Sequence, residues 1–599
     1  MNYGKSKIVI KPSGKGLYNS TWIYVPSKIA KDSSFPFKEG EEVLIEIKND
    51  SLIITKSNKK TRLMKKLGVP EIRLSKLLEV KAETFGDHKY LYYKDKSYTF
   101  DDINKSSNKF AWGILEIIQN LSLKKPKIAI MIRNCPNFLF AWFGCIKAGC
   151  ILVPINPDFP EDYIKHILVD SDSEILLIDY QLYSLYQKIK GYLPKIKKVY
   201  IHNAPDSFHF GENVQNFNSI FTSNIENLSI TIHNNDPTQI LYTEGITGKP
   251  KGVLYRNLVS SSIGISIELN KIGLTQNTKI YCVMPLFHGA TQFYVIIPSL
   301  IHNGTVILAE KFDPVDFWKD VKKYKPDCFA YFGGYLIQLL SNTPKRYDHQ
   351  HSLRWAYGFG AGVEIWKPFE TRFGITLHEC WSHMEGIGIT INSVGTKGGK
   401  MGSVGKSLSD IDLKIVDSEG KTLGTGPDNI GEIVVRSKYN YSFEYYKEPE
   451  KTDVRIGENG WVFTGDYGYI DDDGYVYFMG KKNEIIIKAN EMIFLKEIEK
   501  TANSHPSIRI SACIPVKNKS TNTTEMVLFA VKAKNSSITP QKLKNYLYHN
   551  LAFYQVPRYI EFKDRLPIGP STEYFKSKLL EEWNSKILKK ERKNEALKV

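Results

Sequence analysis

The chain has 599 residues, of which 42% are hydrophobic and 24% are charged. This length exceeds what one hydrophobic core organises, so several domains are expected, and the composition excludes a disordered or fibrous protein. The net charge of +17 comes mainly from scattered lysines, which is more typical of a solvated surface than of a nucleic-acid groove. The second interpretation is an attraction for polyanions, including nucleotides and anionic membrane surfaces.

Seven cysteines are thinly spread and show no Cys-x-x-Cys spacing. This pattern excludes a disulfide framework and a zinc site, and it indicates buried thiols in a reducing compartment. The first residues lack the apolar core of a signal peptide. The most apolar run, 138–153, is interrupted by Lys147 and closed by Pro154, so it is too short to span a membrane. We therefore expect a cytoplasmic protein.

Residues 1–56 look separate from the rest. Strands are predicted at 22–26 and 42–47, and Asn49-Asp50 indicates a hairpin into 51–55. This order resembles the small swapped-hairpin barrels of AbrB-like transcription regulators. The resemblance implies dimerisation and, in some members, DNA binding, and we favour the alternative of a small structural or dimerising appendage. Residues 57–71, rich in Lys, Asn and Thr, are predicted to be a linker.

From residue 70 to about 330, apolar strands alternate with helical patterns. Strands are predicted at 127–132, 151–154 and 175–178, and the helices between them at 137–148 and 163–169. This β-α-β order predicts parallel sheets covered by helices.

A glycine-rich stretch, 243–253, directly follows a predicted strand at 239–242. Glycine lets backbone N–H groups converge on an anion, and the carboxyl end of a strand is where α/β sheets bind ligands. The stretch is not a Walker A motif, because Lys249 is followed by Pro250. A surface turn is the alternative, but the position favours a phosphate-binding loop.

Beyond residue 400, short strands separated by Gly and Asp turns predict an antiparallel subdomain, and a smaller α+β unit follows Gly480. The expected domains are a large one at 72–479, a mobile one at 480–585 and a charged tail at 586–599. The segments that predict the antiparallel subdomain are 431–436, 460–466 and 471–477, in which short strands mix with Gly and Asp turns. Beyond Gly480 the expected elements are strands at 484–487, 508–515 and 526–533, and helices at 495–502 and 540–551.

Six segments between residues 72 and 582 resemble, in order, the signatures of the adenylate-forming superfamily of acyl-CoA synthetases, luciferases and peptide-synthetase adenylation domains. These segments are 241–253, 284–288, 358–374, 379–386, 461–468 and 480–484. The resemblance implies an α/β domain with parallel-rich sheets and an antiparallel subdomain, followed by a mobile α+β domain. It also implies an AMP-forming acid–CoA ligase that uses ATP, Mg²⁺ and coenzyme A. The run 360–374 looks most like fatty-acid-transport-type and carnitine-type ligases, which favours a fatty or short branched acid.

The resemblance assigns roles to particular residues. The phosphates would be held by Thr243, Gly245, Thr247, Gly248 and Lys251, Mg²⁺ by Glu385, and the ribose by Asp466 with Lys481. Gly358, Gly360, Ala361 and Trp381 would lie on the adenine and acyl side, His288 in the acyl pocket, Asn483 at the hinge, and Lys576 between the carboxylate and the α-phosphate. Structural alternatives stay open: a core histidine for His288, a turn for Asp466, packing for Trp381 and a surface lysine for Lys576.

The chain also departs from the family pattern. Glu244 and Ile246 replace a Ser and a Thr of the phosphate loop, Ala489-Asn490 replaces a Gly-Gly pair, and Glu573 stands where an ungapped alignment places the catalytic lysine. These departures support an alternative: a degenerate regulatory protein that binds a nucleotide or acyl-CoA. The expected partners are a carboxylic acid and coenzyme A. A homo-oligomer through residues 1–56 and peripheral membrane contact stay open, and DNA binding is less expected.

Overall fold

The computed structural model divides the chain into two compact units, Met1–Pro70 and Glu71–Val599. The residues it describes in the first unit are the strands 8–12, 19–23, 43–48 and 51–56. In the second unit they are 73–233, 235–243, 249–385, 389–392, 399–408, 411–437, 443–488, 491–518, 523–567, 576 and 578–587.

The first unit contains two antiparallel strand pairs. β1 (Ile8–Pro12) pairs with β2 (Asn19–Ile23), and β3 (Val43–Lys48) pairs with β4 (Ser51–Lys56). Lys48 faces Ser51, which confirms the predicted hairpin. The swapped barrel and the linker at 57–71 stay predictions, because the residues between the strands and the whole linker lie outside the described part of the chain.

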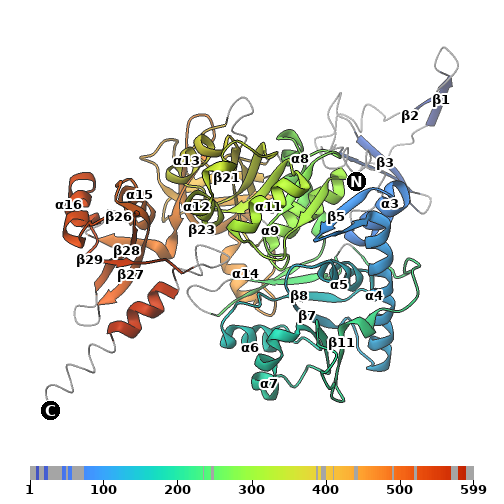
Figure 1. Cartoon of the computed structure of the whole chain (residues 1–599). Helices are drawn as coiled ribbons and strands as arrows, with labels where there is room; N and C mark the ends of the chain where they lie inside the picture. Colours follow the sequence, from blue (N-terminus) through green and yellow to red (C-terminus); the bar gives the residue numbers. More distant parts are fainter. Residues whose placement is uncertain are drawn as a thin grey trace. The chain divides into compact units, whose positions relative to one another are not determined.

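A seven-stranded sheet lies in the first half of the second unit, in the order β11-β10-β9-β7-β8-β12-β13. Neighbouring strands are parallel except β12 and β13. Figure 1 shows α4 and α5 beside this sheet, and α6 and α7 pack on its core side chains. The strands are β7 (Lys127–Met131), β8 (Ile151–Pro154), β9 (Ile175–Asp179), β10 (Lys198–His202), β11 (Val214–Asn216), β12 (Gln239–Tyr242) and β13 (Gly252–Tyr255). The helices are α4 (Phe100–Asn120), α5 (Pro136–Lys147), α6 (Glu161–Asp170) and α7 (Tyr183–Ile189). The predicted β-α-β order is confirmed.

A nine-stranded sheet has the order β20-β19-β18-β17-β16-β14-β15-β5-β6 and is parallel from β18 to β5. Trp318, Leu336 and Phe369 bring α11, α12 and α13 into its buried core. The strands are β5 (Lys89–Tyr93), β6 (Lys96–Thr99), β14 (Lys279–Cys282), β15 (Thr305–Leu308), β16 (Cys328–Phe332), β17 (Trp355–Phe359), β18 (Thr376–Ser382), β19 (Ile389–Ile391) and β20 (Lys406–Ser407). The helices are α3 (Leu74–Phe85), α8 (Leu258–Lys271), α9 (Gly289–Thr291), α10 (Ile297–His302), α11 (Pro314–Tyr324), α12 (Gly333–Asn342) and α13 (Val363–Phe373).

Local sequence explains where several of these helices begin. Thr99 and Asp102 form a capping box at the start of α4, in which each side chain accepts a hydrogen bond from the other residue's backbone N–H. Asp313 caps α11 and is followed by Pro314, whose fixed φ suits the first helical position. Each such cap contributes about 1 kcal/mol to stability.

The antiparallel subdomain is confirmed as a four-stranded sheet, β21 (Ile411–Val416), β22 (Gly431–Ser437), β23 (Val462–Ile470) and β24 (Val476–Lys481), with α14 (Pro449–Arg455) before β23. The segment 471–477 contains a turn followed by the start of β24 at Val476, as its Asp and Gly residues predict. The α+β region beyond Gly480 is also confirmed. It contains β25 (Ile485–Lys488), β26 (Glu491–Phe494), α15 (Leu495–Asn503), β27 (Ile508–Asn518), β28 (Thr523–Lys532), α16 (Pro540–Asn550) and β29 (Tyr559–Lys563).

The small three-stranded sheet β27-β28-β29 is covered on both faces. Leu495, Ile498 and Leu543 pack on one face, and Leu579 and Trp583 pack on the other. Residues 578–587 form a helix, and this helix belongs to the core through Leu579 and Trp583. Among the helices in the described ranges, none is long and apolar enough to cross a membrane.

Candidate active site

Two buried carboxylates, Glu385 and Asp466, lie on either side of one imidazole. Nδ1 of His383 lies 3.1 Å from Oε2 of Glu385, and Nε2 of the same ring lies 3.1 Å from Oδ2 of Asp466. Trp381 donates a 2.7 Å hydrogen bond from its indole N–H to Oδ2 of Asp466. β18 supplies Trp381 and ends just before His383, whereas Asp466 lies in β23, so the cluster joins two sheets.

Three more residues connect this cluster to the end of the glycine-rich stretch. Tyr445 donates a 2.5 Å hydrogen bond to Oε1 of Glu385, and Arg455 contacts the same oxygen at 2.8 Å. The ammonium of Lys251 lies 4.7 Å from the centre of the Tyr445 ring. Cationic and carboxylate groups therefore follow one another from Lys251 to Asp466.

The electrostatics of the cluster are set by His383. Burial opposes its protonation, but the charge of Asp466 and hydrogen bonds to Asp466 and Glu385 outweigh burial and raise the pKa of the imidazole to about 9. Burial also opposes ionisation of Glu385, yet its hydrogen bond to His383 and the charges of His383 and Arg455 hold the pKa of this carboxyl well below its usual range. The pKa of Asp466 is lowered in the same way, against burial and mainly by the charge of His383. At neutral pH the cluster thus holds an imidazolium between two carboxylates.

The remaining hydrogen-bonding capacity fits a nucleotide. Oδ1 of Asp466 is buried and has no hydrogen-bond partner among the described residues. An unpaired buried polar atom costs on the order of 1–3 kcal/mol, and a ribose hydroxyl is a donor that would relieve this cost. Glu385 has the hard oxygen ligands that Mg²⁺ takes. Both oxygens are already engaged, Oε1 by Tyr445 and Arg455 and Oε2 by His383, so Mg²⁺ would take the place of one of these contacts.

The end of β17 lies against Glu379 of β18. Gly358 is in the strand and pairs with Glu379, and Gly360 and Ala361 directly follow the strand. The backbone N–H of Ala361 donates to Oε1 of Glu379 at 3.0 Å, and the N–H of Gly360 contacts the same oxygen. Gly360 has φ of +88°, and a Cβ at Gly358 would lie 2.0 Å from the carbonyl oxygen of Tyr331. Both positions therefore require glycine. Burial raises the pKa of Glu379 to about 7 despite these hydrogen bonds.

His288 is a helix-capping residue in the structure. Its Nδ1 accepts a 3.0 Å hydrogen bond from the N–H of Ala290, and its ring packs edge-on against Phe332 at 5.2 Å. Burial lowers its pKa to about 4, so the ring is neutral. Its place in an acyl pocket stays a prediction.

Thr243 and Lys251 bracket the glycine-rich stretch and hold its ends together. The hydroxyl of Thr243 accepts a 3.1 Å hydrogen bond from the N–H of Lys251, and the N–H of Thr243 donates to the carbonyl of Lys251 at 2.9 Å. Between them, Gly245, Thr247 and Gly248, as well as Glu244 and Ile246, lie outside the described residues. The same is true of Ala489, Asn490, Glu573 and the side chain of Asn483. Lys481 ends β24 directly opposite Asp466 in register.

Lys576 is not part of this cluster. Its ammonium lies 3.1 Å from Oε1 of Glu484 and 3.0 Å from Oε1 of Glu499, and its side chain is only 8% exposed. Burial opposes protonation of Lys576, but the charges of these two carboxylates raise its pKa above the usual range. The interpretation of Lys576 as a solvated surface lysine is therefore wrong, and its role in catalysis stays a prediction.

The sequence arguments missed His383, Tyr445 and Arg455 as members of the cluster. A signal existed for His383, because Trp381, His383 and Glu385 alternate at the end of a strand and alternate residues point to one side. The position of Tyr445 is fixed through its chain neighbour Tyr446. The backbone N–H of Tyr446 donates a 2.7 Å hydrogen bond to the carbonyl of Gly252. No local pattern marks this long-range pairing.

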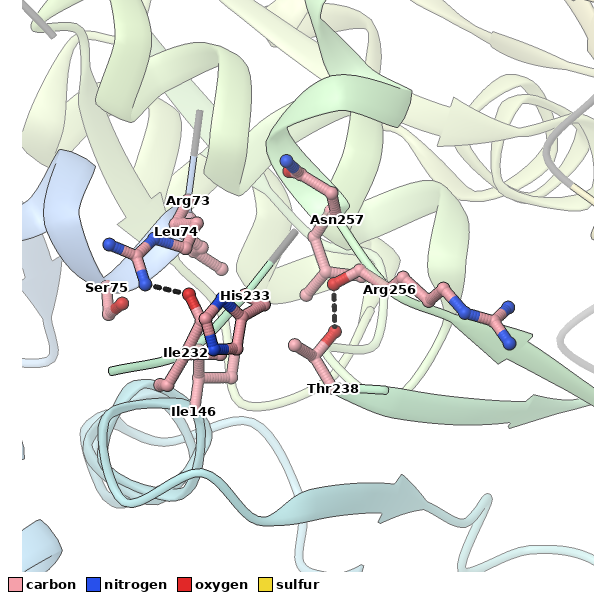
Figure 2. A pocket seen from close by; sticks show the side chains of 10 residues that line it. Arg73, Leu74, Ser75, Ile146, Ile232, His233, Thr238, Arg256 and Asn257 are labelled. Carbon is pink, nitrogen blue, oxygen red and sulfur yellow. Dashed lines mark hydrogen bonds between the residues drawn. The ribbon is translucent and has the colours of Figure 1, made fainter. Parts of the chain in front are cut away.

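A separate cavity shares none of these residues. Figure 2 shows Arg73 directed at the backbone of Ile232, and Thr238 directed at the backbone of Arg256. The cavity measures about 10 Å³, which is room for about one water molecule. It is therefore too small for a substrate. The lining residues are Arg73, Leu74, Ser75, Ile146, Ile232, His233, Thr238, Arg256, Asn257 and Leu258.

Solved structures share this fold. An anthranilate CoA ligase, AuaEII, in complex with anthranoyl-AMP superposes with a TM-score of 0.72 at 21% identity, over 84% of this chain and 97% of that ligase. The o-succinylbenzoate coenzyme A synthetase MenE of Bacillus subtilis, in complex with ATP and magnesium ion, superposes with a TM-score of 0.68 at 22% identity, over 82% of this chain and 97% of that synthetase. The α/β adenylating fold with a C-terminal α+β region is thus established.

The sequence comparison identifies the family. The model of the AMP-binding enzymes matches residues 78–446, and the chain belongs to this family, among its AMP-forming acid–CoA ligases. A crotonobetaine/carnitine–CoA ligase of Salmonella paratyphi A is 26% identical over 516 residues, which cover 83% of this chain and 97% of that ligase.

Proposed function

We propose that this protein activates a fatty or short branched carboxylic acid with ATP and transfers the acyl group to coenzyme A. The carboxylate would attack the α-phosphate to give an acyl-adenylate and pyrophosphate, and the thiol of coenzyme A would then displace AMP. The observation that carries the proposal is the buried cluster of Glu385 and Asp466, with one oxygen of Asp466 left unpaired.

The proposed roles are those that the family resemblance implies. Oδ1 of Asp466 would accept a hydrogen bond from the ribose, with Lys481 alongside it. Thr243 and Lys251 would hold the phosphates together with Gly245, Thr247 and Gly248. Glu385 would hold Mg²⁺, which when bound neutralises phosphate charge and polarises the α-phosphate. Gly358, Gly360, Ala361 and Trp381 would line the adenine and acyl side, His288 the acyl pocket, and Asn483 the hinge.

The acid class rests on the likeness of 360–374 to fatty-acid-transport-type and carnitine-type ligases and on the crotonobetaine/carnitine–CoA ligase among the relatives. His288 is consistent with an aliphatic acid. Because its ring is neutral and packs on Phe332, it offers no positive charge to a second carboxylate.

The test is acid-dependent exchange of pyrophosphate into ATP over a panel of straight, branched, quaternary-ammonium and aryl carboxylates. We expect exchange with aliphatic acids, and acyl-AMP and acyl-CoA by mass spectrometry when coenzyme A is added. Protein that binds ATP but supports no exchange with any acid would contradict the proposal.

The second candidate, a regulatory protein that binds a nucleotide or acyl-CoA, is favoured by one observation. Lys576 is held between Glu484 and Glu499, so this lysine would have to leave two buried carboxylates before it reached a phosphate. ATP or acyl-CoA binding without exchange, together with self-association through residues 1–56, would support this candidate.

A further inference from the structure

One helix, α6, contacts the chain on both sides of 244–248, the part of the glycine-rich stretch that lies outside the described residues. Nε2 of His166 lies 3.0 Å from the carbonyl oxygen of Pro250. The hydroxyl of Tyr242 donates a 2.6 Å hydrogen bond to Oδ2 of Asp170. His166 and Asp170 are four residues apart in α6, so they lie on the same side of the helix. One face of one helix therefore holds the glycine-rich stretch at both of its ends.

The contact of His166 orients the peptide unit between Pro250 and Lys251. This unit is planar, so its carbonyl oxygen and its N–H point in opposite directions. His166 lies at the carbonyl oxygen, and the N–H of Lys251 donates to the hydroxyl oxygen of Thr243 at 3.1 Å. The N–H of Thr243 in turn donates to the carbonyl of Lys251 at 2.9 Å. The imidazole, the peptide unit and the hydroxyl thus form one hydrogen-bonded series that ends at Thr243.

The direction of this series decides what Thr243 can do. The carbonyl oxygen of Pro250 can only accept a hydrogen bond, so Nε2 of His166 is the donor. The hydroxyl oxygen of Thr243 accepts the N–H of Lys251, so the hydrogen of this hydroxyl is the part that can donate to a phosphate. A hydrogen bond to an ionised acceptor is also stronger than a neutral one. His166 therefore acts on the hydroxyl of Thr243 from outside the site.

A second contact connects α6 to the carboxylate cluster. The ammonium of Lys447 donates a 2.7 Å hydrogen bond to the carbonyl oxygen of Asp170. Tyr445, two residues earlier in the chain, donates a 2.5 Å hydrogen bond to Oε1 of Glu385. The same helix thus supports the glycine-rich stretch and the segment that carries Tyr445.

We propose that His166 is a positioning residue for the phosphates of ATP, and that Asp170 supports the glycine-rich stretch from its other end. The inference rests on the phosphate-binding role proposed above for Thr243 and Lys251, because both residues of α6 act through these two. Without the imidazole donor, the peptide unit before Lys251 loses its fixed orientation, and the hydroxyl of Thr243 loses its fixed direction. A stretch that is held in its binding geometry spends less free energy on ordering when the ligand binds.

The test compares the affinity for ATP, measured by equilibrium dialysis with Mg²⁺ and without any acid, in two variants of His166. His166→Phe keeps a ring and removes the donor, so we expect ATP to bind roughly three- to tenfold more weakly, as for the loss of one hydrogen bond. His166→Gln keeps an N–H donor, and we expect it to recover most of the affinity. His209→Phe, at an exposed histidine outside α6, is the matched control and leaves the affinity unchanged.

Kinetics provide a readout that a merely structural role would not move. Once an acid substrate is known, we expect His166→Phe to raise the KM for ATP and to leave the KM for coenzyme A unchanged. A loss of folded protein would instead lower the apparent kcat and leave both KM values as they are. An ATP affinity equal to that of the wild-type protein, in folded His166→Phe, overturns the inference.

Two further outcomes keep the test decisive. If His166→Phe does not fold, Tyr242→Phe decides, because it removes only the hydroxyl that Asp170 accepts. Weaker ATP binding in this variant supports the inference, and unchanged binding overturns it. Wild-type protein that binds ATP but exchanges no pyrophosphate contradicts the proposed ligase function and leaves the role of His166 measurable, whereas wild-type protein that binds no ATP overturns this inference.

Discussion

Glu385 and Asp466 contact opposite nitrogens of the same imidazole, each at 3.1 Å. Two buried carboxylates at this separation repel each other unless a cation lies between them. Their joint presence in the site therefore depends on His383. The neighbouring cation Arg455 contacts Glu385, whereas Asp466 interacts with the imidazole, with Trp381 and with the charge of Lys481.

Asp466→Asn is expected to weaken ATP and AMP binding by roughly ten- to a hundredfold, because a hydrogen bond to a charged acceptor contributes about 1.5–3 kcal/mol. Equilibrium dialysis or calorimetry measures the effect without turnover. Asp428→Asn, at an exposed position, is the control with the same chemical change. Equal affinities of the two variants would exclude Asp466 as the ribose acceptor.

His383→Ala is expected to destabilise the second unit, because it leaves two buried carboxylates without the cation between them. Removal of one partner of a buried ionic pair costs roughly 3–5 kcal/mol. A lower Tm in thermal melts, partly recovered by added Mg²⁺ and ATP, is the expected result. His209→Ala is the control, and a Tm loss as small as that of the control would contradict the bridging role of His383.

Lys576→Met is expected to destabilise the C-terminal region, because Glu484 and Glu499 would then face each other unpaired. Lys578→Met is the matched control, since Lys578 lies two residues away and pairs with Glu581 at 3.1 Å. Limited proteolysis and thermal melts measure the difference. A comparable loss of stability in both variants would contradict the role of Lys576 as the buried cation between Glu484 and Glu499.

The catalytic role of Lys576 needs a second variant that folds. In Lys576→Met combined with Glu484→Gln and Glu499→Gln, the repulsion is removed together with the lysine. Pyrophosphate exchange that falls strongly in this variant, but not in Glu484→Gln/Glu499→Gln alone, would support the proposed role. Unchanged pyrophosphate exchange would show that Lys576 has a structural role only.

Stability is expected to depend on pH through His202. Burial opposes its protonation, but hydrogen bonds to Asp179 and Cys135 raise its pKa to about 9 from the ordinary 6.5. The contribution of the protonated ring is therefore fully present below about pH 6.5 and is lost as pH rises through 9. The Tm difference between the wild-type protein and Asp179→Asn should be larger at about pH 6 than at about pH 9.5. A difference that does not vary with pH would contradict this.

Much of the fold was predictable because buried parallel strands leave a local mark. The run 151–154 was predicted with the limits that β8 has, since a strand covered on both faces is a continuous apolar segment. β29 was missed, because Tyr559–Lys563 mixes polar and apolar residues and pairs on one side only. Residues 578–587 form a core helix, although lysines and glutamates surround Leu579 and Trp583 in the sequence.

The sequence by itself determined the order of the elements and the family, and it singled out Glu385 and Asp466 as candidate site residues, because motifs and hydrophobic patterns are local properties of the chain. Only the tertiary structure decided that His383 lies between these carboxylates, that Tyr445 and Arg455 complete the cluster, and that Lys576 is buried between Glu484 and Glu499. Each of these contacts joins residues of different elements. Ion pairing depends on distance and burial, and strand pairing fixes both of these across long separations in sequence.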